Sequence, residues 1–308
     1  VHNLVKTKMQ AAIVSNDDIR AETNSFNLIA APGFPEMLDE MVSLSTDRRN
    51  TAFVIADSPF RLKADATSTK NWATNANNAS ENGEDGLISA SPYAAVYYPS
   101  ALTTNLDGTN VVVPSSHVAL RTLAFNDQVA FPWFAPAGFQ RGLVQNATSV
   151  GFVDLTSGEY TSVTLNEGQR DTLYSNKINP IASFPRQGFV IFGQKTLQVA
   201  RSALDRVNVR RMMIECRKTI ASFSRLFIFE PNTVATRERL LTQVNDYLSS
   251  VQAANGINEF RAVLDETTTT PDLIDRNIIK GKIFLKPTTA AEIVIFDFTV
   301  TPNGAAFS

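Results

Sequence analysis

The hydrophobic pattern of the first half alternates short apolar runs with segments of helical spacing. Three apolar runs, each closed within three residues by a proline, predict buried strands: residues 26–31, 51–56 and 94–98. Apolar residues at helical spacing predict helices over residues 35–44 and 114–125, and the polar residues 65–86 between them predict a long connection. Strands that alternate with helices indicate an α/β domain with a largely parallel sheet.

The second half changes to two long helices followed by strands. Val209, Met213, Cys216 and Ile220 lie four, three and four residues apart, which predicts a helix over residues 202–223. The other predicted elements are a strand-like run at residues 226–229, a helix at 233–254, and strands at 259–264, 282–285 and 292–300. This order indicates an α+β unit of two helices and an antiparallel sheet.

The two patterns divide the chain into two domains. The expected fold is α/β followed by α+β, with the boundary near Phe184. We therefore expect an α/β domain over residues 1–183 and a smaller helix-and-sheet domain over residues 184–308.

Composition narrows the class of protein without identifying one. Hydrophobic residues make up 44% of the 308 residues and charged residues 19%, below the roughly 25% typical of soluble domains. The 20 phenylalanines predict apolar area that is buried either in large interfaces or in the core of a monomer. Cys216 is the only cysteine, which excludes an internal disulfide and a cysteine-based zinc site. No apolar run reaches membrane-spanning length, and a net charge of −2 gives no general reason to expect nucleic acid.

Candidate catalytic motifs lack the residues that their chemistry needs. Residues 188–196 nearly match a phosphate-binding loop, but Gln194 separates the second glycine from Lys195, and the residues between the glycines favour a strand. A serine hydrolase needs an oriented histidine base, and His2 and His117 are the only histidines. Neither the acidic groups nor the glycines fit a calcium or dinucleotide site. We therefore predict no catalytic, cofactor-binding or metal-binding residues.

One segment carries an unusual concentration of positive charge. Residues 201–225 contain seven basic and two acidic side chains, so the segment carries +5 on a chain of net charge −2. Such a helix favours an anionic partner surface. The alternative is a helix whose charges pair with acidic groups elsewhere in the chain.

Several segments resemble, in order, motifs of contractile phage tail sheath proteins. They are residues 91–99 (SPYAAVYYP), 133–142 (WFAPAGFQRG), 179–181 (NPI) with 193–196 (GQKT), 207–211 (VNVRR), 229–232 (FEPN), 265–275 (DETTTTPDLID) and 287–296 (PTTAAEIVIF). Each motif alone is modest, but their shared order from about residue 91 to 298 makes the resemblance strong. Residues 1–90 match less clearly.

The resemblance implies a fold and a mode of assembly. It implies a subtilisin-like α/β sheath domain without the protease triad, followed by a C-terminal sheath domain near the tail axis. Such proteins would form stacked hexameric rings around an inner tube, contact baseplate and tail terminator proteins, and contract to drive the tube through the host envelope. The expected location is the virion, after assembly in the host cytoplasm. Because the chain begins at Val1, we expect a processed or trimmed chain that is incomplete at its N-terminus.

Two sets of residues are expected to contact other subunits or the tube. One face of the last predicted strand is apolar, with Val294, Phe296, Phe298 and Val300, so we expect it to pair with a neighbouring subunit. In the basic segment, we expect Arg210, Arg217 and Lys218 to face the tube. We expect Arg211 to pair within its own subunit.

Alternative functions from other classes make different predictions. A bacterial contractile injection device of the tailocin type would share the same motifs. An α/β hydrolase or nucleotide-binding enzyme would need a triad or phosphate site, which the motifs above do not supply. A basic-helix protein that binds nucleic acid would show a steep salt dependence of binding. For a sheath protein, we expect neither binding to nucleic acid nor insertion into a membrane.

Overall fold

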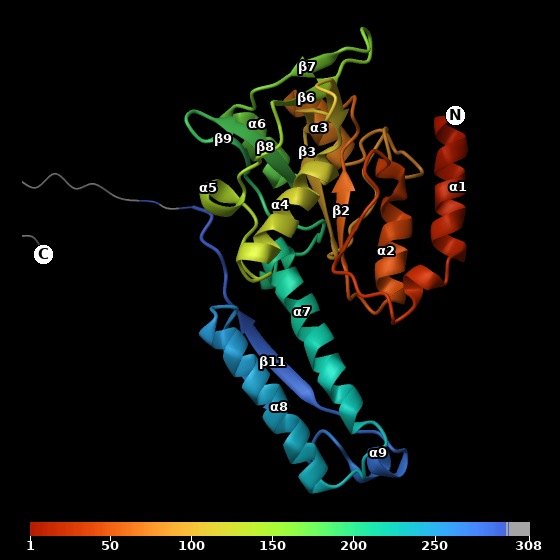
Figure 1. Cartoon of the computed structure of the whole chain (residues 1–308), viewed down its shortest axis with the longest axis vertical. Helices are drawn as coiled ribbons and strands as arrows, with labels where there is room; N and C mark the ends of the chain where they lie inside the picture. Colours follow the sequence, from red (N-terminus) through yellow and green to blue (C-terminus); the bar gives the residue numbers. More distant parts are fainter. Residues whose placement is uncertain (294, 296–308) are drawn as a thin grey trace, which may run out of the picture.

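A five-stranded sheet forms the centre of the computed structural model, which describes residues 1–293 and 295 (Figure 1). Its strands follow the order β1 (Leu28–Ala30), β2 (Phe53–Asp57), β3 (Ala94–Tyr98), β8 (Ile178–Phe184) and β9 (Gly188–Ile191). The first four strands are parallel, and β9 runs antiparallel to β8. The predicted α/β unit with a largely parallel sheet is therefore confirmed.

Helices cover both faces of this sheet, which explains why its strands read as continuous apolar runs. Val54 and Ala56 face one layer, which is formed by α2 (Leu38–Asp47), α3 (Ala66–Ala73) and α6 (Glu167–Ser175). Phe53 and Ile55 face the other layer, which is formed by α4 (Ser115–Val129) and the first half of α7 (Val207–Ser224). Helix α1 (His2–Ser15) packs outside α2.

A second sheet lies at one end of the α/β unit (Figure 1). Its antiparallel strands follow the order β5 (Asn110–Val113), β4 (Ser100–Thr104), β6 (Ser149–Val153) and β7 (Tyr160–Ser162). Gly151 on β6 lies so close to β7 that a Cβ would meet the Thr161 carbonyl oxygen at 2.0 Å. The short helix α5 (Gly138–Arg141) follows the tryptophan-containing loop.

A smaller unit projects from the α/β unit along α7 (Figure 1). It contains α7, α8 (Val234–Ala253), α9 (Pro271–Asp275) and the hairpin of β10 (Ile257–Val263) and β11 (Lys282–Pro287). The described residues also form four short 3-10 helices: η1 (Asp18–Arg20), η2 (Pro35–Met37), η3 (Ala203–Asp205) and η4 (Arg225–Phe227). The predicted α+β character of the second half is confirmed.

The structure corrects several expected elements. Strand β9 pairs with β8 across the boundary expected near Phe184, so the α/β sheet continues to Ile191. The polar connection at residues 65–86 contains α3, which starts at the Asp65 cap and buries Trp72. The strand expected at residues 226–229 is instead η4 and a turn. Most of the strand expected at residues 292–300 lies outside the described residues.

Asp57 joins the end of β2 to the start of α4. Its carboxylate accepts hydrogen bonds from the backbone of Gly33 (2.8 Å) and Ser116 (2.6 Å) and from the hydroxyls of Ser115 (3.2 Å) and Ser116 (2.9 Å). The residue is only 4% exposed, and burial raises the pKa of its carboxyl. The four donors offset part of the cost of removing this group from water, and burial still outweighs them in the pKa.

Replacing Asp57 with alanine is expected to lower the free energy of unfolding by about 3 kcal/mol, because buried N–H groups lose their acceptor. Urea unfolding followed by circular dichroism measures the change. Asp154→Ala is the matched control, because Asp154 accepts two backbone hydrogen bonds in an exposed turn. Equal unfolding midpoints for the two variants would contradict the structural role of Asp57.

Candidate functional site at the junction of the two units

Helix α7 contributes side chains to the cores of both units. Val207 and Ile214, seven residues apart, pack with the α/β core beneath the sheet. Val209, Met212 and Cys216 occupy another face and pack with α8 and β10. Because both stripes lie on one rigid helix, the junction between the units is a continuous helix with packed side chains on two faces.

The buried arginines of α7 pair inside the chain. Arg211 is 4% exposed and its Nη2 donates to the carboxylate of Asp127 on α4 (2.5 Å). Arg210 is 8% exposed, donates to the Leu204 carbonyl (3.1 Å) and to Gln198 (2.6 Å), and stacks 4.8 Å above the Tyr93 ring. The internal pairing expected for Arg211 is confirmed.

The exposure expected for Arg210 is wrong. The helix period places Arg210 beside Arg217, but the first turns of α7 are covered by residues 198–204 and by Tyr93, whereas the end of α7 projects away from the sheet (Figure 1). Helical periodicity predicts the direction in which a side chain points from the helix axis. It does not predict whether another segment covers that side chain, and this differs between the start and the end of α7.

The later basic residues of α7 contact the loop and helix ends around β1. Arg217 is exposed and donates to the Arg49 carbonyl (2.9 Å). Lys218 is half-buried and donates to the Phe26 carbonyl (3.2 Å) and to the Asn27 side chain. Arg225 then pairs with Glu22 in an exposed ion pair (2.8 Å). Most charges of the basic segment therefore attach α7 to its own α/β unit, and this supports the alternative of internal pairing.

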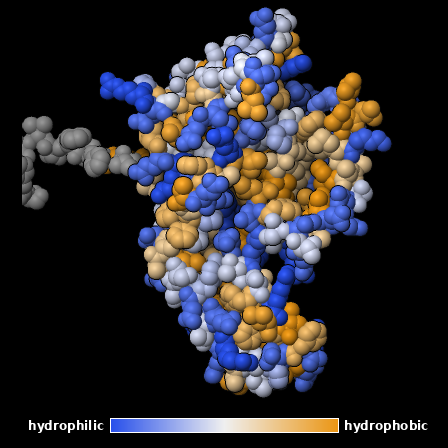
Figure 2. All heavy atoms as spheres, viewed as in Figure 1, coloured by the Kyte–Doolittle hydropathy of each residue, from blue (hydrophilic) through white to orange (hydrophobic). Residues whose placement is uncertain are grey.

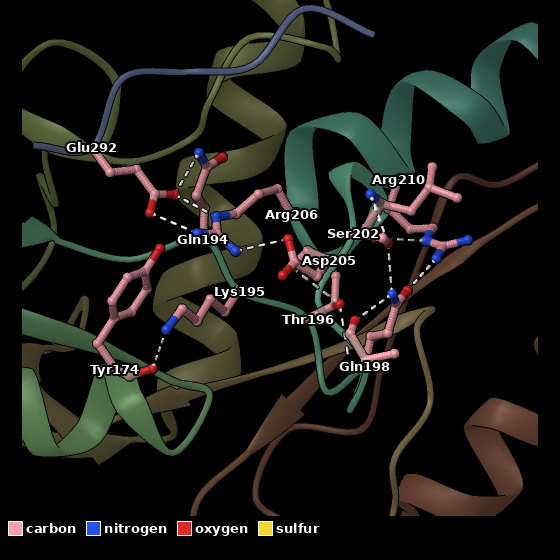
Figure 3. A network of polar contacts seen from close by, with 12 residues as sticks. Tyr174, Gln194, Lys195, Thr196, Gln198, Ser202, Asp205, Arg206, Arg210 and Glu292 are labelled. Carbon is pink, nitrogen blue, oxygen red and sulfur yellow. Dashed lines mark hydrogen bonds and ion pairs between the residues drawn. The ribbon is translucent and has the colours of Figure 1, made fainter. Parts of the chain in front are cut away.

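A polar network at the start of α7 anchors the segment that follows the hairpin (Figure 3). Arg206 holds the Glu292 carboxylate with two nitrogens, Nε at 2.6 Å and Nη2 at 2.9 Å. Its third nitrogen donates to Asp205 (2.7 Å). Gln194, 3% exposed, adds a hydrogen bond to Glu292 (3.2 Å), and the Tyr174 hydroxyl points toward the same carboxylate. We call these contacts of Glu292 the Glu292 clamp.

Opposing effects set the charge state of the clamp. Burial alone would raise the pKa of Glu292, but hydrogen bonds from Arg206 and Tyr174 outweigh it and hold the pKa below its ordinary value. Burial lowers the pKa of the nearby Lys195 ammonium, and Arg206 adds to this shift. Lys195 donates to the Tyr174 carbonyl (2.8 Å) and lies 4.0 Å from its ring centroid. The clamp is thus an ionised carboxylate held by a guanidinium.

The network also explains why residues 188–196 resemble a phosphate-binding loop without forming one. Residues 188–191 are the strand β9, as expected, and their backbone groups pair with β8 instead of facing an anion. Lys195 is engaged by Tyr174, and its backbone N–H donates to Asn179 (2.7 Å). The motif therefore builds the junction of the two units.

Among the described residues, no serine side chain is hydrogen-bonded to either histidine, although His2 Nε2 lies 3.0 Å from the Glu36 carboxylate. His117 is exposed on the first turn of α4, whereas Ser115 and Ser116 are buried and donate to Asp57. Within the described residues, no group of three histidine, cysteine, aspartate or glutamate side chains could hold a metal ion. Burial raises the pKa of the Cys216 thiol to about 11, which makes it unreactive at neutral pH. In the described part of the chain, no helix has the length and apolar character needed to cross a membrane.

An apolar hollow lies at the far end of the projecting unit, and sequence reasoning missed it. It measures about 880 Å³ and lies between the ends of α7 and α8 and the hairpin, with Ile220, Leu241 and Ile283 in its walls. The turn at its rim exposes Leu226, Ile228 and Phe229, and Figure 2 shows hydrophobic residues gathered at this end. The apolar run at residues 226–229 was the only signal for it.

The hairpin beside this hollow has free edges. Strands β10 and β11 form a two-stranded sheet, so among the described residues each has one edge without a strand partner. The strand expected to pair between subunits carries Val294, Phe296, Phe298 and Val300, and these four residues lie outside the described part of the chain. Ile293 and Ile295 beside them are 80% and 79% exposed.

Sequence comparisons match this chain to phage tail sheath proteins. Residues 200–301 match the family described as phage tail sheath C-terminal domain. The chain is 35% identical over 185 residues to the tail sheath protein of Vibrio phage KVP40 and 33% identical over 184 residues to that of Enterobacteria phage T4. Each match covers 60% of this chain and 26% of the relative, so the chain spans only a part of these relatives.

Solved structures share the fold. The chain superposes with a TM-score of 0.75 on a sheath complex of an extracellular contractile injection system (PVC) in the contracted state, at 22% identity, over 93% of this chain and 74% of the other. For the contracted helical sheath of the anti-feeding prophage, the TM-score is 0.70 at 20% identity, over 92% and 74%. The chain is therefore related to the contractile tail sheath proteins, whose fold it has and whose C-terminal domain it carries.

Proposed function

We propose that the chain is a structural subunit of a contractile tail sheath, which polymerises as stacked hexameric rings around an inner tube and contracts to drive that tube through the host envelope. The observation that carries this proposal is the sequence match to tail sheath proteins, together with the match of residues 200–301 to the tail sheath C-terminal domain family. The similarity of fold to contracted sheaths supports it.

The proposed role is mechanical, without catalysis. The curated relatives are tail sheath proteins, and two buried charged groups of this chain join its elements. Asp57 ties a strand to a helix, and Arg211 ties α7 to α4. His117 and Lys195, which a hydrolase or nucleotide enzyme would use, are respectively exposed and engaged by Tyr174.

Assembly is proposed to use the free edges of the β10–β11 hairpin. A two-stranded sheet is marginal alone, and a third strand would pair its open backbone groups. The segment with Val294, Phe296, Phe298 and Val300 has the alternation that such a strand needs, with apolar side chains on one face. The apolar hollow next to the hairpin supports an apolar partner segment at this place.

The proposed partners follow from this role. They are other copies of the chain, the inner tail tube, and the baseplate and tail terminator proteins, within a virion assembled in the host cytoplasm. Nucleic acid and membrane insertion have no part in the proposal. A similar fold in the anti-feeding prophage baseplate structure, with a TM-score of 0.71, supports contacts of such chains in a baseplate.

A second candidate is the sheath of a bacterial contractile injection device. The observation that favours it is the fold shared with the extracellular injection system over 93% of this chain. The higher sequence identity to phage tail sheath proteins favours the phage assignment. Both candidates give the subunit the same mechanical task.

Purified protein is expected to form striated hollow cylinders or rings in negative-stain images, and a chain that ends at Ile293 is expected to form none. The shortened chain keeps Glu292 but loses the proposed inter-subunit strand, so its circular dichroism spectrum and thermal midpoint should stay close to those of the full chain. Normal cylinders from the shortened chain would contradict the strand proposal. Loss of folding would instead show that the segment pairs within its own unit.

Contact of the basic segment with the tube is proposed to rest on Arg217, which is the exposed member of the set Arg210, Arg217 and Lys218. Arg217→Glu is expected to weaken co-assembly on purified tubes several-fold at low salt and little at high salt, since one exposed ionic contact contributes about 0.2–1 kcal/mol. Arg239→Glu, on the exposed face of α8, is the control. Equal effects of the two variants would show a general charge effect and exclude Arg217.

A further inference from the structure

The chain between the hairpin and the Glu292 clamp is held at its two ends. At one end, the Thr288 N–H donates to the Gly256 carbonyl (3.2 Å) and its hydroxyl to the Asn258 side chain (3.0 Å). At the other end, Glu292 is held by Arg206 and Gln194. Residues 289–291 between them are exposed and belong to no helix or strand. The contacts at Thr288 and Glu292 therefore hold this stretch against the rest of the molecule, and residues 289–291 between them are exposed.

The attachment at Glu292 is polar and local. Ile293 and Ile295, which follow it, are 80% and 79% exposed, so they add little apolar anchoring. The side chains of Arg206 and Glu292 are 23% and 27% exposed, which leaves the ion pair within reach of water. The Arg211–Asp127 pair between α7 and α4 differs from it. Its arginine is only 4% exposed, and both helices pack in the α/β core.

We propose that the Glu292 clamp is a releasable anchor that sets the free length of the C-terminal segment. With the clamp closed, the chain is held at Glu292, beside Arg206. With the clamp open, the last held residue is Thr288, and residues 289–292 become part of the tether. Four extended residues add roughly 14 Å of reach. This inference rests on the proposed sheath function, in which the segment stays attached to a neighbour while the subunits move.

The physical requirement for such a device is simple. A segment that pairs with a neighbouring subunit must bridge two distances, one before and one after the subunits rearrange. A short tether orders the first arrangement, and a longer tether permits the second without breaking the pairing. An ion pair suits this task, because water can take over both charges once the clamp opens, whereas a buried apolar anchor would expose its surface.

Acid is a second way to open the clamp. The pKa of Glu292 lies below its ordinary value in the folded protein, so the clamp is fully present above the ordinary pKa of about 4.3. It is lost as the pH falls through the lower pKa of the folded state. Neutral solution therefore keeps the clamp closed.

The clamp itself is tested by distance measurement between spin labels at Asp171→Cys on α6 and Ile293→Cys. The native Cys216 is buried with a raised thiol pKa and should not be labelled. We expect one narrow distance distribution for the otherwise unchanged protein and a broad one when Glu292→Ala is added. Glu259→Ala, which breaks an exposed ion pair with Lys286 on the hairpin, is the control and should leave the distribution narrow. A narrow distribution for Glu292→Ala would overturn the proposal.

Release during rearrangement is tested on assembled cylinders. Glu292→Ala cylinders should contract at a lower urea concentration than unchanged cylinders, or form directly in the contracted state, and Glu259→Ala cylinders should behave as unchanged ones. An unaltered contraction threshold, or complete failure of the folded Glu292→Ala protein to form cylinders, would overturn the proposal. If the unchanged protein forms no cylinders, the sheath function fails instead, and the label distances still decide whether the clamp holds the segment.

Discussion

The structure depends on helix α7, which packs in two hydrophobic cores and also carries positively charged side chains that need partners. Helix α7 places Val207 and Ile214 under the α/β sheet and Val209, Met212 and Cys216 against α8. Arg210 and Arg211 are buried where the helix passes between these cores, so each needs a partner from the same chain. Arg211 has Asp127, and Arg210 has the Leu204 carbonyl, Gln198 and the Tyr93 ring.

This constraint gives the two units a shared packed helix, whereas the stretch after β11 is attached to the rest of the molecule by a few side chains. The packed helix couples the two units, while the stretch after β11 is attached through Thr288 and the Glu292 clamp. The hairpin next to this stretch offers free strand edges and an apolar hollow. In the proposed sheath function, these free strand edges are where a neighbouring subunit would add a strand.

The sequence predicted most of the helices and strands, but it did not predict which residues contact one another across the fold. The stripe of Val209, Met213, Cys216 and Ile220 predicted α7 because periodicity is local information. The exposure of Arg210 was mispredicted because its cover comes from Tyr93 and from the loop before the helix. Glu292 could not be assigned, because its partner Arg206 lies 86 residues away and a single carboxylate carries no pattern.

Two smaller errors of the sequence-based prediction, at α3 and at residues 226–229, also have local causes. Helix α3 was missed because its sequence is polar and small apart from Trp72, and its start depends on the Asp65 cap. The apolar run before Pro231 reads as a strand, yet it forms η4 and a turn with Phe229 at a positive φ of 71°. In the described residues it has no strand to pair with, and propensity alone does not make a strand.

The coupling of the two units through α7 is tested most directly with the two tryptophans. Trp72 is 3% exposed in the α/β core, and Trp133 packs with the core of α7 and α8, where its indole N–H donates to the Ala254 carbonyl (2.9 Å). The variants Trp72→Phe and Trp133→Phe each leave one reporter. In each variant, tryptophan fluorescence and far-ultraviolet circular dichroism are followed through urea unfolding. Our account predicts coincident transitions by both probes in both variants. A fluorescence transition of the Trp133 reporter that precedes the loss of helix and sheet would show that the projecting unit unfolds alone, and would contradict the account.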